Sequence, residues 1–200
     1  MMRNLTTAAE GEIFIMKNRK NQEWNPYTSK WKAALEKNLN VGLKGDESIL
    51  YLGASSGTTV GQISKLTRGL IFAVENSPQM AIRLVKLAEK KENIVPIFSD
   101  ARNTEYLKKA IFGKKINILF QDIPSADQIK ILGNASGIVD KECKIFLSLK
   151  TQSISQKDYK ETAKEIEKRL VENFEIIQKS DLYPFHKKHF FYVLRKIIKK

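Results

Sequence analysis

A segment of small residues follows the first strongly apolar run of the chain. The segment Ser48–Val60 reads Ser-Ile-Leu-Tyr-Leu-Gly-Ala-Ser-Ser-Gly-Thr-Thr-Val, which predicts a buried strand that ends at Gly53 and a helix that starts near Thr59. Glu75 closes the next apolar run, 22 residues after Gly53. Free N–H groups at a helix start bind anions, and a carboxylate accepts hydrogen bonds from ribose hydroxyls. This combination is typical of a nucleoside-binding unit.

The spacing of the glycines restricts the ligand. Gly53 and Gly57 are four residues apart, which is not the G-x-G-x-x-G spacing of dinucleotide sites. The hydroxyls of Thr58 and Thr59 follow directly, where they either cap the helix or contact a carboxylate. A ribose together with an amino-acid carboxylate fits S-adenosylmethionine better than a pyrophosphate cofactor.

Further ionisable side chains occur at the ends of predicted strands. Asp100 and Asp122 each follow a strand, Lys150 ends one, and His189 begins the last. Each has a plainer explanation as a turn aspartate, a first solvated lysine or a structural histidine. The carboxyl ends of parallel strands meet at one edge of a sheet, where ligands bind. Together with Lys30, which opens an amphipathic helix, these residues favour a site at that edge.

The elements that position these residues alternate between strand and helix. The apolar runs are short and rich in Ile, Leu, Val and Phe, which is typical of strands buried on both faces of a parallel sheet. Helical patterns lie between them: Ser77-Pro78 supplies an N-cap and an N1 proline, and Ser125 with Gln128 resembles a capping box. We therefore predict an α/β fold with helices on both faces of the sheet. The predicted strands are Ser48–Leu52, Leu70–Glu75, Ile94–Phe98, Ile116–Gln121, Ile145–Lys150, Phe174–Asp181 and His189–Lys196.

The last two predicted strands are joined only by Leu182–Lys188, which is too short for a helical crossover. They should therefore pair antiparallel. A seven-stranded, mostly parallel sheet that ends in an antiparallel hairpin is the Rossmann-like pattern of class I S-adenosylmethionine-dependent methyltransferases. Residues 1–28 are polar and poorly patterned, and they predict a short arm or a small β-hairpin. Residues 29–200 would form the methyltransferase domain.

The composition restricts the partners and the compartment. Lys and Arg outnumber Asp and Glu by 35 to 22, so the net charge is +13, which reflects either simple solubility or a polyanionic partner such as nucleic acid. Cys143 is the only cysteine, which excludes an intramolecular disulfide and a cysteine zinc cluster, and its place beside an apolar run predicts an inert buried thiol. The apolar runs are shorter than the roughly 18 residues of a membrane helix, and no signal-peptide core is evident. We expect a cytoplasmic protein without a membrane partner.

Several separated motifs, in the same order, resemble the fibrillarin family. One is similar to the family's Trp-Asn-Pro-x-Arg-Ser-Lys segment, and another to its cofactor loop. The resemblance runs from about Trp24 to Arg195, which is nearly the whole chain. The matching segments are Trp24–Lys30, Ile49–Thr59, Asn93–Ile97, Asp100–Arg102 and Leu182–Phe185, followed by His189.

The resemblance implies an archaeal-type RNA ribose 2′-O-methyltransferase that uses S-adenosylmethionine and is directed by a box C/D guide RNA, with pre-rRNA as substrate and tRNA as a further one. The implied partners are a Nop-domain scaffold protein, a kink-turn-binding protein of the ribosomal type, the guide RNA and the target RNA. Carried over to this sequence, the catalytic set is Lys30, Asp122, Lys150 and His189. The cofactor contacts are Gly53, Thr58, Thr59, Glu75, Asn76, Asp100, Ala101, Asp122 and Ser125.

The chain departs from the family pattern at three positions. Thr28 stands where the family has arginine, Asn76 where it usually has phenylalanine, and Ser125 where it has glutamine. Asn76 offers no ring for stacking on adenine. The region before Trp24 is also shorter than in most archaeal relatives.

The implied chemistry is an in-line transfer of a methyl group to a ribose 2′-oxygen. We expect Lys150 to stabilise the developing alkoxide, Asp122 to hold Lys150 and the ribose, and Lys30 and His189 to complete the hydrogen-bonded set. Two alternatives remain at this stage. One is a stand-alone methyltransferase that acts on RNA or a small molecule, and the other is a non-catalytic structural subunit of an RNA–protein complex.

Overall fold

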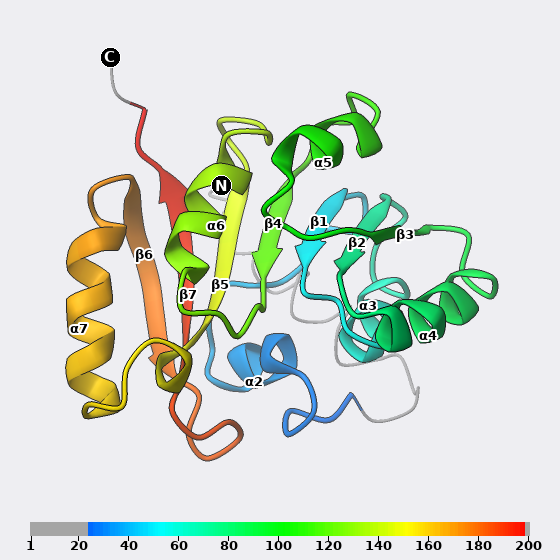
Figure 1. Cartoon of the computed structure of the whole chain (residues 1–200). Helices are drawn as coiled ribbons and strands as arrows, with labels where there is room; N and C mark the ends of the chain where they lie inside the picture. The colour runs from blue at the N-terminus through cyan, green and yellow to red at the C-terminus, as the bar shows by residue number, and fades with distance from the viewer. Residues whose placement is uncertain (1–23, 199–200) are drawn as a thin grey trace, which may run out of the picture.

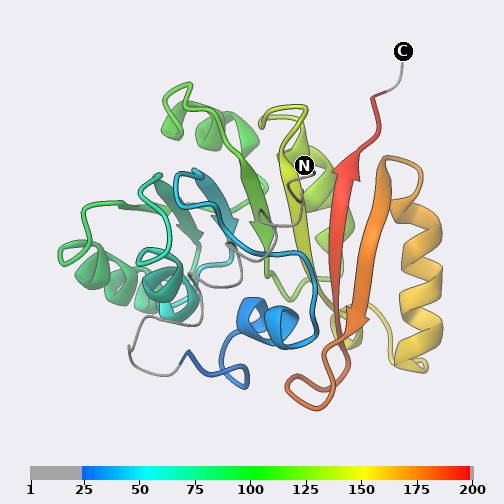
Figure 2. The same ribbon diagram turned by 180° about the vertical axis from the view of Figure 1, so that it is seen from behind.

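Within residues 24–198, the part of the chain that the computed structural model describes, seven strands form one sheet in the order β3-β2-β1-β4-β5-β7-β6 (Figures 1 and 2). The first five strands pair in parallel, whereas β7 pairs antiparallel with both β5 and β6. The predicted mostly parallel sheet and its antiparallel hairpin are therefore confirmed. The strands are β1 (Ile49–Leu52), β2 (Ile71–Glu75), β3 (Ile94–Phe98), β4 (Ile118–Gln121), β5 (Lys144–Lys150), β6 (Phe174–Asp181) and β7 (His189–Lys196).

Every predicted strand is present, and the ends differ from the predicted ones by at most two residues. The predicted N-terminal arm, residues 1–28, falls mostly outside the described residues, and Trp24 to Thr28 form a turn ahead of the first described helix. No described helix has the length and apolarity needed to cross a membrane. The helices are α2 (Lys30–Glu36), α3 (Thr58–Ile63), α4 (Pro78–Ala88), α5 (Thr104–Ala110), α6 (Gln128–Ser136), the 3-10 turn η1 (Thr151–Ser153) and α7 (Tyr159–Leu170).

Helices cover both faces of the sheet, because the central strands are apolar on both sides. All residues of β1, β2 and β4 are buried. One cluster of buried residues joins the sheet to α2, α3 and α4 through Trp31, Val60 and Leu84. The other joins it to α5, α6 and α7 and contains Cys143. Cys143 is buried, as predicted, and burial raises the pKa of its thiol to about 12, which disfavours the reactive thiolate.

The start of α6 differs from the prediction. The helix begins one residue after Asp127 and has no capping box, because the Ser125 hydroxyl bonds Asp127 and Arg102 instead of a helix N–H. The Gln128 side chain is also used elsewhere: it is fully buried and bonds the backbone of Ser125 and Lys150. The predicted N-cap at Ser77 and N1 proline at Pro78 are at the start of α4, although the Ser77 side chain makes no capping bond.

Candidate functional site

The loop after β1 takes its shape from two glycines in the left-handed region, Gly53 with φ 82° and Gly57 with φ 87°. A Cβ on Gly53 would lie 2.6 Å from the carbonyl oxygen of Asp122, and one on Gly57 would lie 2.5 Å from a methyl carbon of Leu87. Gly53 is therefore required by packing against the backbone of the β4 loop, whereas Gly57 is required mainly by its left-handed backbone, because the Leu87 side chain on α4 can move.

Glu75 fixes the far side of this loop. Its carboxylate, only 8% exposed, accepts hydrogen bonds from the backbone N–H groups of Ser55 at 2.7 Å, Asn76 at 3.0 Å and Ser77 at 2.8 Å. A carboxylate has about four acceptor positions. Glu75 thus ties the loops after β1 and β2 together and keeps acceptor capacity for a further donor.

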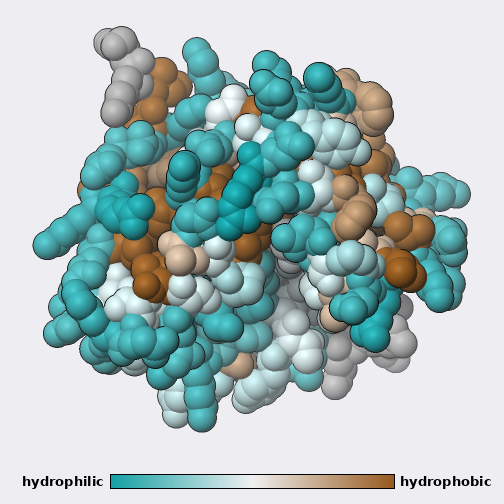
Figure 3. All heavy atoms as spheres, viewed as in Figure 1, coloured by the Kyte–Doolittle hydropathy of each residue, from teal (hydrophilic) through white to brown (hydrophobic). Residues whose placement is uncertain are grey.

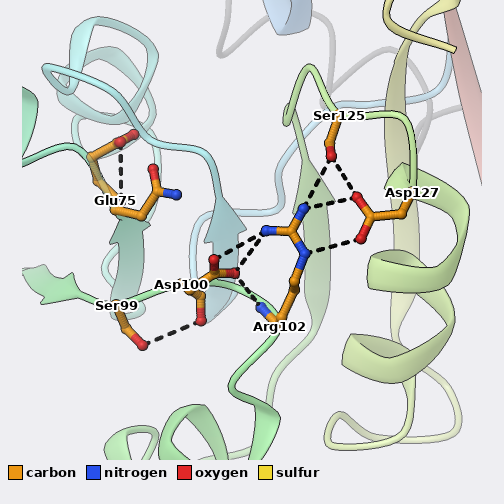
Figure 4. A network of polar contacts seen from close by, with 7 residues as sticks. Glu75, Ser99, Asp100, Arg102, Ser125 and Asp127 are labelled. Atoms are coloured by element: carbon orange, nitrogen blue, oxygen red, sulfur yellow. Dashed lines mark hydrogen bonds and ion pairs between the residues drawn. The ribbon is translucent and has the colours of Figure 1, made fainter.

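Arg102 links the loops after β3 and β4 (Figure 4). Its guanidinium pairs with Asp100 at 3.0 Å and with Asp127 at 2.8 Å, and it donates to the Ser125 hydroxyl at 3.1 Å. Figure 4 shows the guanidinium lying between these groups. Hydrogen bonds from Arg102 and Ser125 hold the pKa of Asp127 far below its usual range. Sequence reasoning missed Arg102 as a site residue, although it stands directly after the Asp100-Ala101 motif.

These loops enclose a hollow of about 370 Å³ at the carboxyl ends of the parallel strands. The structure thus brings together most of the predicted cofactor residues. Of the predicted set, Thr58, Thr59, Ser125, Lys150 and His189 are not part of the lining. The predicted site residues that line it are Lys30, Gly53, Glu75, Asn76, Asp100, Ala101 and Asp122.

The Thr59 side chain makes a contact within the fold. It is buried, and its hydroxyl donates to the Ser29 hydroxyl at 3.0 Å. Ser29 is also the N-cap of α2, where its side chain accepts from the Lys32 N–H. The bond therefore joins the start of α3 to the start of α2, next to Lys30. Thr58 is exposed at the start of α3.

Lys30 and Asp122 form an ion pair of 3.1 Å at the edge of the hollow. Both side chains are partly buried, with 27% and 14% exposure, so the pair is shielded from solvent more than a surface pair would be. The sequence predicted that Asp122 holds Lys150. The structure pairs it with Lys30 instead, because α2 crosses the carboxyl ends of the strands (Figures 1 and 2).

His189 lies opposite Lys150 in the register of β5 and β7. Burial is the main cause that lowers its pKa, and the charges of Lys30 and Lys150 lower it further, against an opposing effect of Asp122. The other three predicted catalytic residues therefore all influence the imidazole of His189. The Nδ1 of His189 lies 2.8 Å from the Lys187 carbonyl oxygen, which can only accept, so the neutral ring carries its proton on Nδ1 and presents Nε2 as an acceptor.

Two supporting residues were missed as site residues. His186 lies with its ring 5.8 Å from that of His189, and its Nε2 donates to the Pro26 carbonyl at 2.8 Å, which fastens the turn before α2 to the β6–β7 loop. Burial is again the main cause that lowers the pKa of His186. Gln128 fixes the backbone of Lys150. The sequence contained a signal for each: His186 is the first histidine of Phe-His-Lys-Lys-His, and Gln128 lies near the Asp122 loop.

The charge of the hollow contrasts with that of the whole chain. Three carboxylates, Glu75, Asp100 and Asp122, line it together with the cations Lys30 and Arg102, and both cations are paired with acids. The site is therefore acidic within a protein of net charge +13. It suits a ligand that carries both hydrogen-bond donors and positive charge.

Comparison with known proteins gives consistent matches over nearly the whole chain. The family model described as fibrillarin matches residues 3–197. The chain is 37% identical over 178 residues to a fibrillarin-like rRNA/tRNA 2′-O-methyltransferase of Pyrococcus abyssi, with 86% of this chain and 78% of the relative covered. It is 34% identical over 173 residues to the protein of the same description from Archaeoglobus fulgidus, with 85% and 81% covered.

Solved structures agree with the matches to the fibrillarin family model and to its relatives. The fibrillarin of a fibrillarin/Nop5p complex superposes with a TM-score of 0.83 at 31% identity, covering 88% of this chain and 84% of that one. Aeropyrum pernix fibrillarin, in complex with natively bound S-adenosyl-L-methionine, gives a TM-score of 0.72 at 30% identity, covering 86% and 76%. The motifs, the sheet order and these matches lead to one conclusion: the chain belongs to the fibrillarin family.

Proposed function

We propose that this protein is an S-adenosylmethionine-dependent RNA ribose 2′-O-methyltransferase that acts on rRNA and tRNA under the direction of a box C/D guide RNA. The observation that carries the proposal is the convergence of Lys30, Asp122, Lys150 and His189 beside an acidic hollow at the carboxyl ends of the parallel strands. The relatives with the same description support the activity.

The acceptor groups that line the hollow match the donor groups of S-adenosylmethionine. Glu75 would accept from the ribose hydroxyls, since its carboxylate retains acceptor capacity beyond its three backbone bonds. Asp100 would accept from the adenine amino group, and the backbone at Ala101 would lie beside the base. The carboxylates also suit the positive charge of the sulfonium and the ammonium. The fibrillarin that binds this cofactor natively supports the assignment.

When bound, the cofactor supplies an electrophilic methyl group. The residues of this chain then have to position the ribose and manage the charge and the proton. The Lys150 ammonium would stabilise negative charge on the 2′-oxygen, and Lys30, held by Asp122, would fix the ribose at the edge of the hollow. The hydroxyl proton would pass to Nε2 of His189, because Nδ1 is already protonated and bonded to the Lys187 carbonyl.

We further propose that the protein works as part of a ribonucleoprotein in the cytoplasm. A Nop-domain scaffold is the partner that the fibrillarin/Nop5p structure supports. The kink-turn-binding protein, the guide RNA and the target RNA are expectations from the family resemblance. The net charge of +13 supports contact with RNA.

The decisive experiment is reconstitution of the full chain with a scaffold protein, a kink-turn-binding protein and a guide RNA, followed by mapping of the methylated ribose. We expect one methyl group at the nucleotide that the guide selects, and a changed guide should move it. Methylation of bare RNA without guide or scaffold would support a stand-alone enzyme instead. Failure to bind S-adenosylmethionine in calorimetric titration would support a structural subunit.

A further inference from the structure

A basic surface with an exposed aromatic ring lies at the end of α5. Phe112 is 80% exposed, and it follows the helix within the sequence Lys108-Lys109-Ala-Ile-Phe-Gly-Lys114-Lys115. All four lysines are exposed. We call Lys108, Lys109, Phe112, Lys114 and Lys115 the α5 surface. Within residues 24–198, none of its lysines makes an ion pair.

The local acids do not neutralise this surface. Glu105 is the single acid within residues 105–115, against four lysines. Asp140 borders the same region, where its carboxylate accepts a hydrogen bond from the Ile116 N–H at 2.8 Å, and the four lysines still outnumber the two acids. The lysines line a hollow of about 880 Å³ together with both acids and the apolar residues of the turn. A concave basic surface of this kind suits an anionic chain.

The backbone conformation that directs Phe112 outward is strained. Phe112 has φ 51°, a left-handed conformation that glycine or asparagine would adopt with less strain. Two hydrogen bonds hold the turn, from the Phe112 N–H to the Lys109 carbonyl at 3.0 Å and from the Lys114 N–H to the Ile111 carbonyl at 2.9 Å. The turn thus directs the ring to the surface and not into the core.

The α5 surface is separate from the candidate functional site. The turn after α5 leads into the amino end of β4, whereas the site lies at the carboxyl ends of the strands. Figures 1 and 2 both show α5 at the end of the molecule opposite α2. The seven residues of β5 that connect the two edges span roughly 20 Å at about 3.3 Å per residue.

We propose that the α5 surface binds single-stranded RNA, with phosphates on its lysines and a base stacked on Phe112. Unpaired lysines around an exposed ring are the combination by which proteins bind single strands without reading sequence. Protein–protein interfaces are instead depleted in lysine, which disfavours a protein partner here. Hydrophilic residues also cover most of the face seen in Figure 3. The inference goes beyond the proposed function, because it needs no residue of the methylation site.

The test measures binding of the full-length protein to a fluorescently labelled oligouridine of about 12 nucleotides, at about 50 to 200 mM salt. Each lysine that neutralises a phosphate contributes about 0.7 to the slope of log K against log salt for single strands. Lys114→Gln/Lys115→Gln should therefore lower the slope by about 1.4. The matched control is Lys164→Gln/Lys168→Gln on α7, which removes the same charge from an exposed face that also carries glutamates and should leave the slope nearly unchanged.

Phe112→Ala should weaken binding at least about fivefold, because a stacked base contributes about 1–3 kcal/mol, and should leave the salt slope unchanged. Phe112→Trp should retain the affinity. An oligonucleotide without bases should bind the wild type and Phe112→Ala equally. Equal losses from the α5 and α7 lysine pairs, or wild-type affinity of Phe112→Ala for the oligouridine, would overturn the proposal. All variants should bind S-adenosylmethionine normally. A failure of the α5 surface to bind RNA is therefore distinguishable from a failure of the proposed catalysis.

Discussion

The side chain of Gln128 holds the backbone of Lys150 with two hydrogen bonds. Gln128 Oε1 accepts from the Lys150 N–H at 3.3 Å, and Nε2 donates to the Lys150 carbonyl at 3.2 Å. The same Nε2 donates to the Ser125 carbonyl at 2.8 Å. Since Gln128 is fully buried, these bonds fix the end of β5 against the loop after β4. The position of the Lys150 side chain therefore depends on a residue of another element.

Gln128→Leu should impair positioning of Lys150. The substitution keeps the side-chain size but leaves buried backbone groups without partners, so the free energy of unfolding should fall by about 1–3 kcal/mol. The rate of methyl transfer at saturating substrates should fall more than the affinity for S-adenosylmethionine. Gln152→Leu, at an exposed position of η1, is the matched control and should change stability by less than about 0.5 kcal/mol. Normal turnover of Gln128→Leu would contradict the positioning role.

Lys150→Ala should slow methyl transfer about 10²–10³-fold while cofactor binding is retained, because Lys150 lies outside the lining of the hollow. Single-turnover rates and calorimetric titration with S-adenosylmethionine measure the two effects. Lys144→Ala, at the exposed other end of β5, is the control and should transfer methyl groups at the wild-type rate. A near-normal rate in Lys150→Ala would show that electrostatic stabilisation comes from elsewhere.

Arg102→Ala should weaken cofactor binding more than it weakens the fold. The lost ion pairs to Asp100 and Asp127 are exposed, and such pairs contribute about 0–1 kcal/mol each. Without Arg102, however, the Asp100 carboxylate and the loop after β4 lose their link at the hollow. We expect a higher dissociation constant for S-adenosylmethionine with a small change in melting temperature. Arg195→Ala, which breaks the exposed ion pair with Glu175, is the control and should change neither the dissociation constant nor the melting temperature by much.

Acid should destabilise the protein through its two histidines, His186 and His189. Both have pKa values lowered in the folded state, mainly by burial. The unfolded chain, with an ordinary pKa of about 6.5, therefore binds more protons over the intervening pH range, and stability rises with pH there. Denaturant unfolding should show a lower free energy at about pH 5.5 than at pH 7.5. The double variant His186→Gln/His189→Gln should show a smaller difference, and an unchanged difference would assign the acid sensitivity to other groups.

The local sequence determined the sheet, because runs of apolar residues mark its strands. Five runs of apolar residues without alternation can be buried only between two layers of helices, and the short Leu182–Lys188 connection allows only an antiparallel pair. The carboxyl ends of β1 to β4 then had to meet at one edge. For this reason Gly53, Glu75, Asp100 and Asp122 could be placed at a common hollow from their positions in the sequence.

Contacts between distant residues were decided only by the tertiary structure. Asp122 pairs with Lys30 and not with Lys150, because α2 crosses the edge where β4 ends. A capping box was predicted at Gln128 from its spacing to Ser125, yet its amide holds Lys150 from 22 residues away. Hydrogen bonds and ion pairs are short-ranged, so they form according to distances that the packed sheet and helices set, which spacing along the chain does not encode.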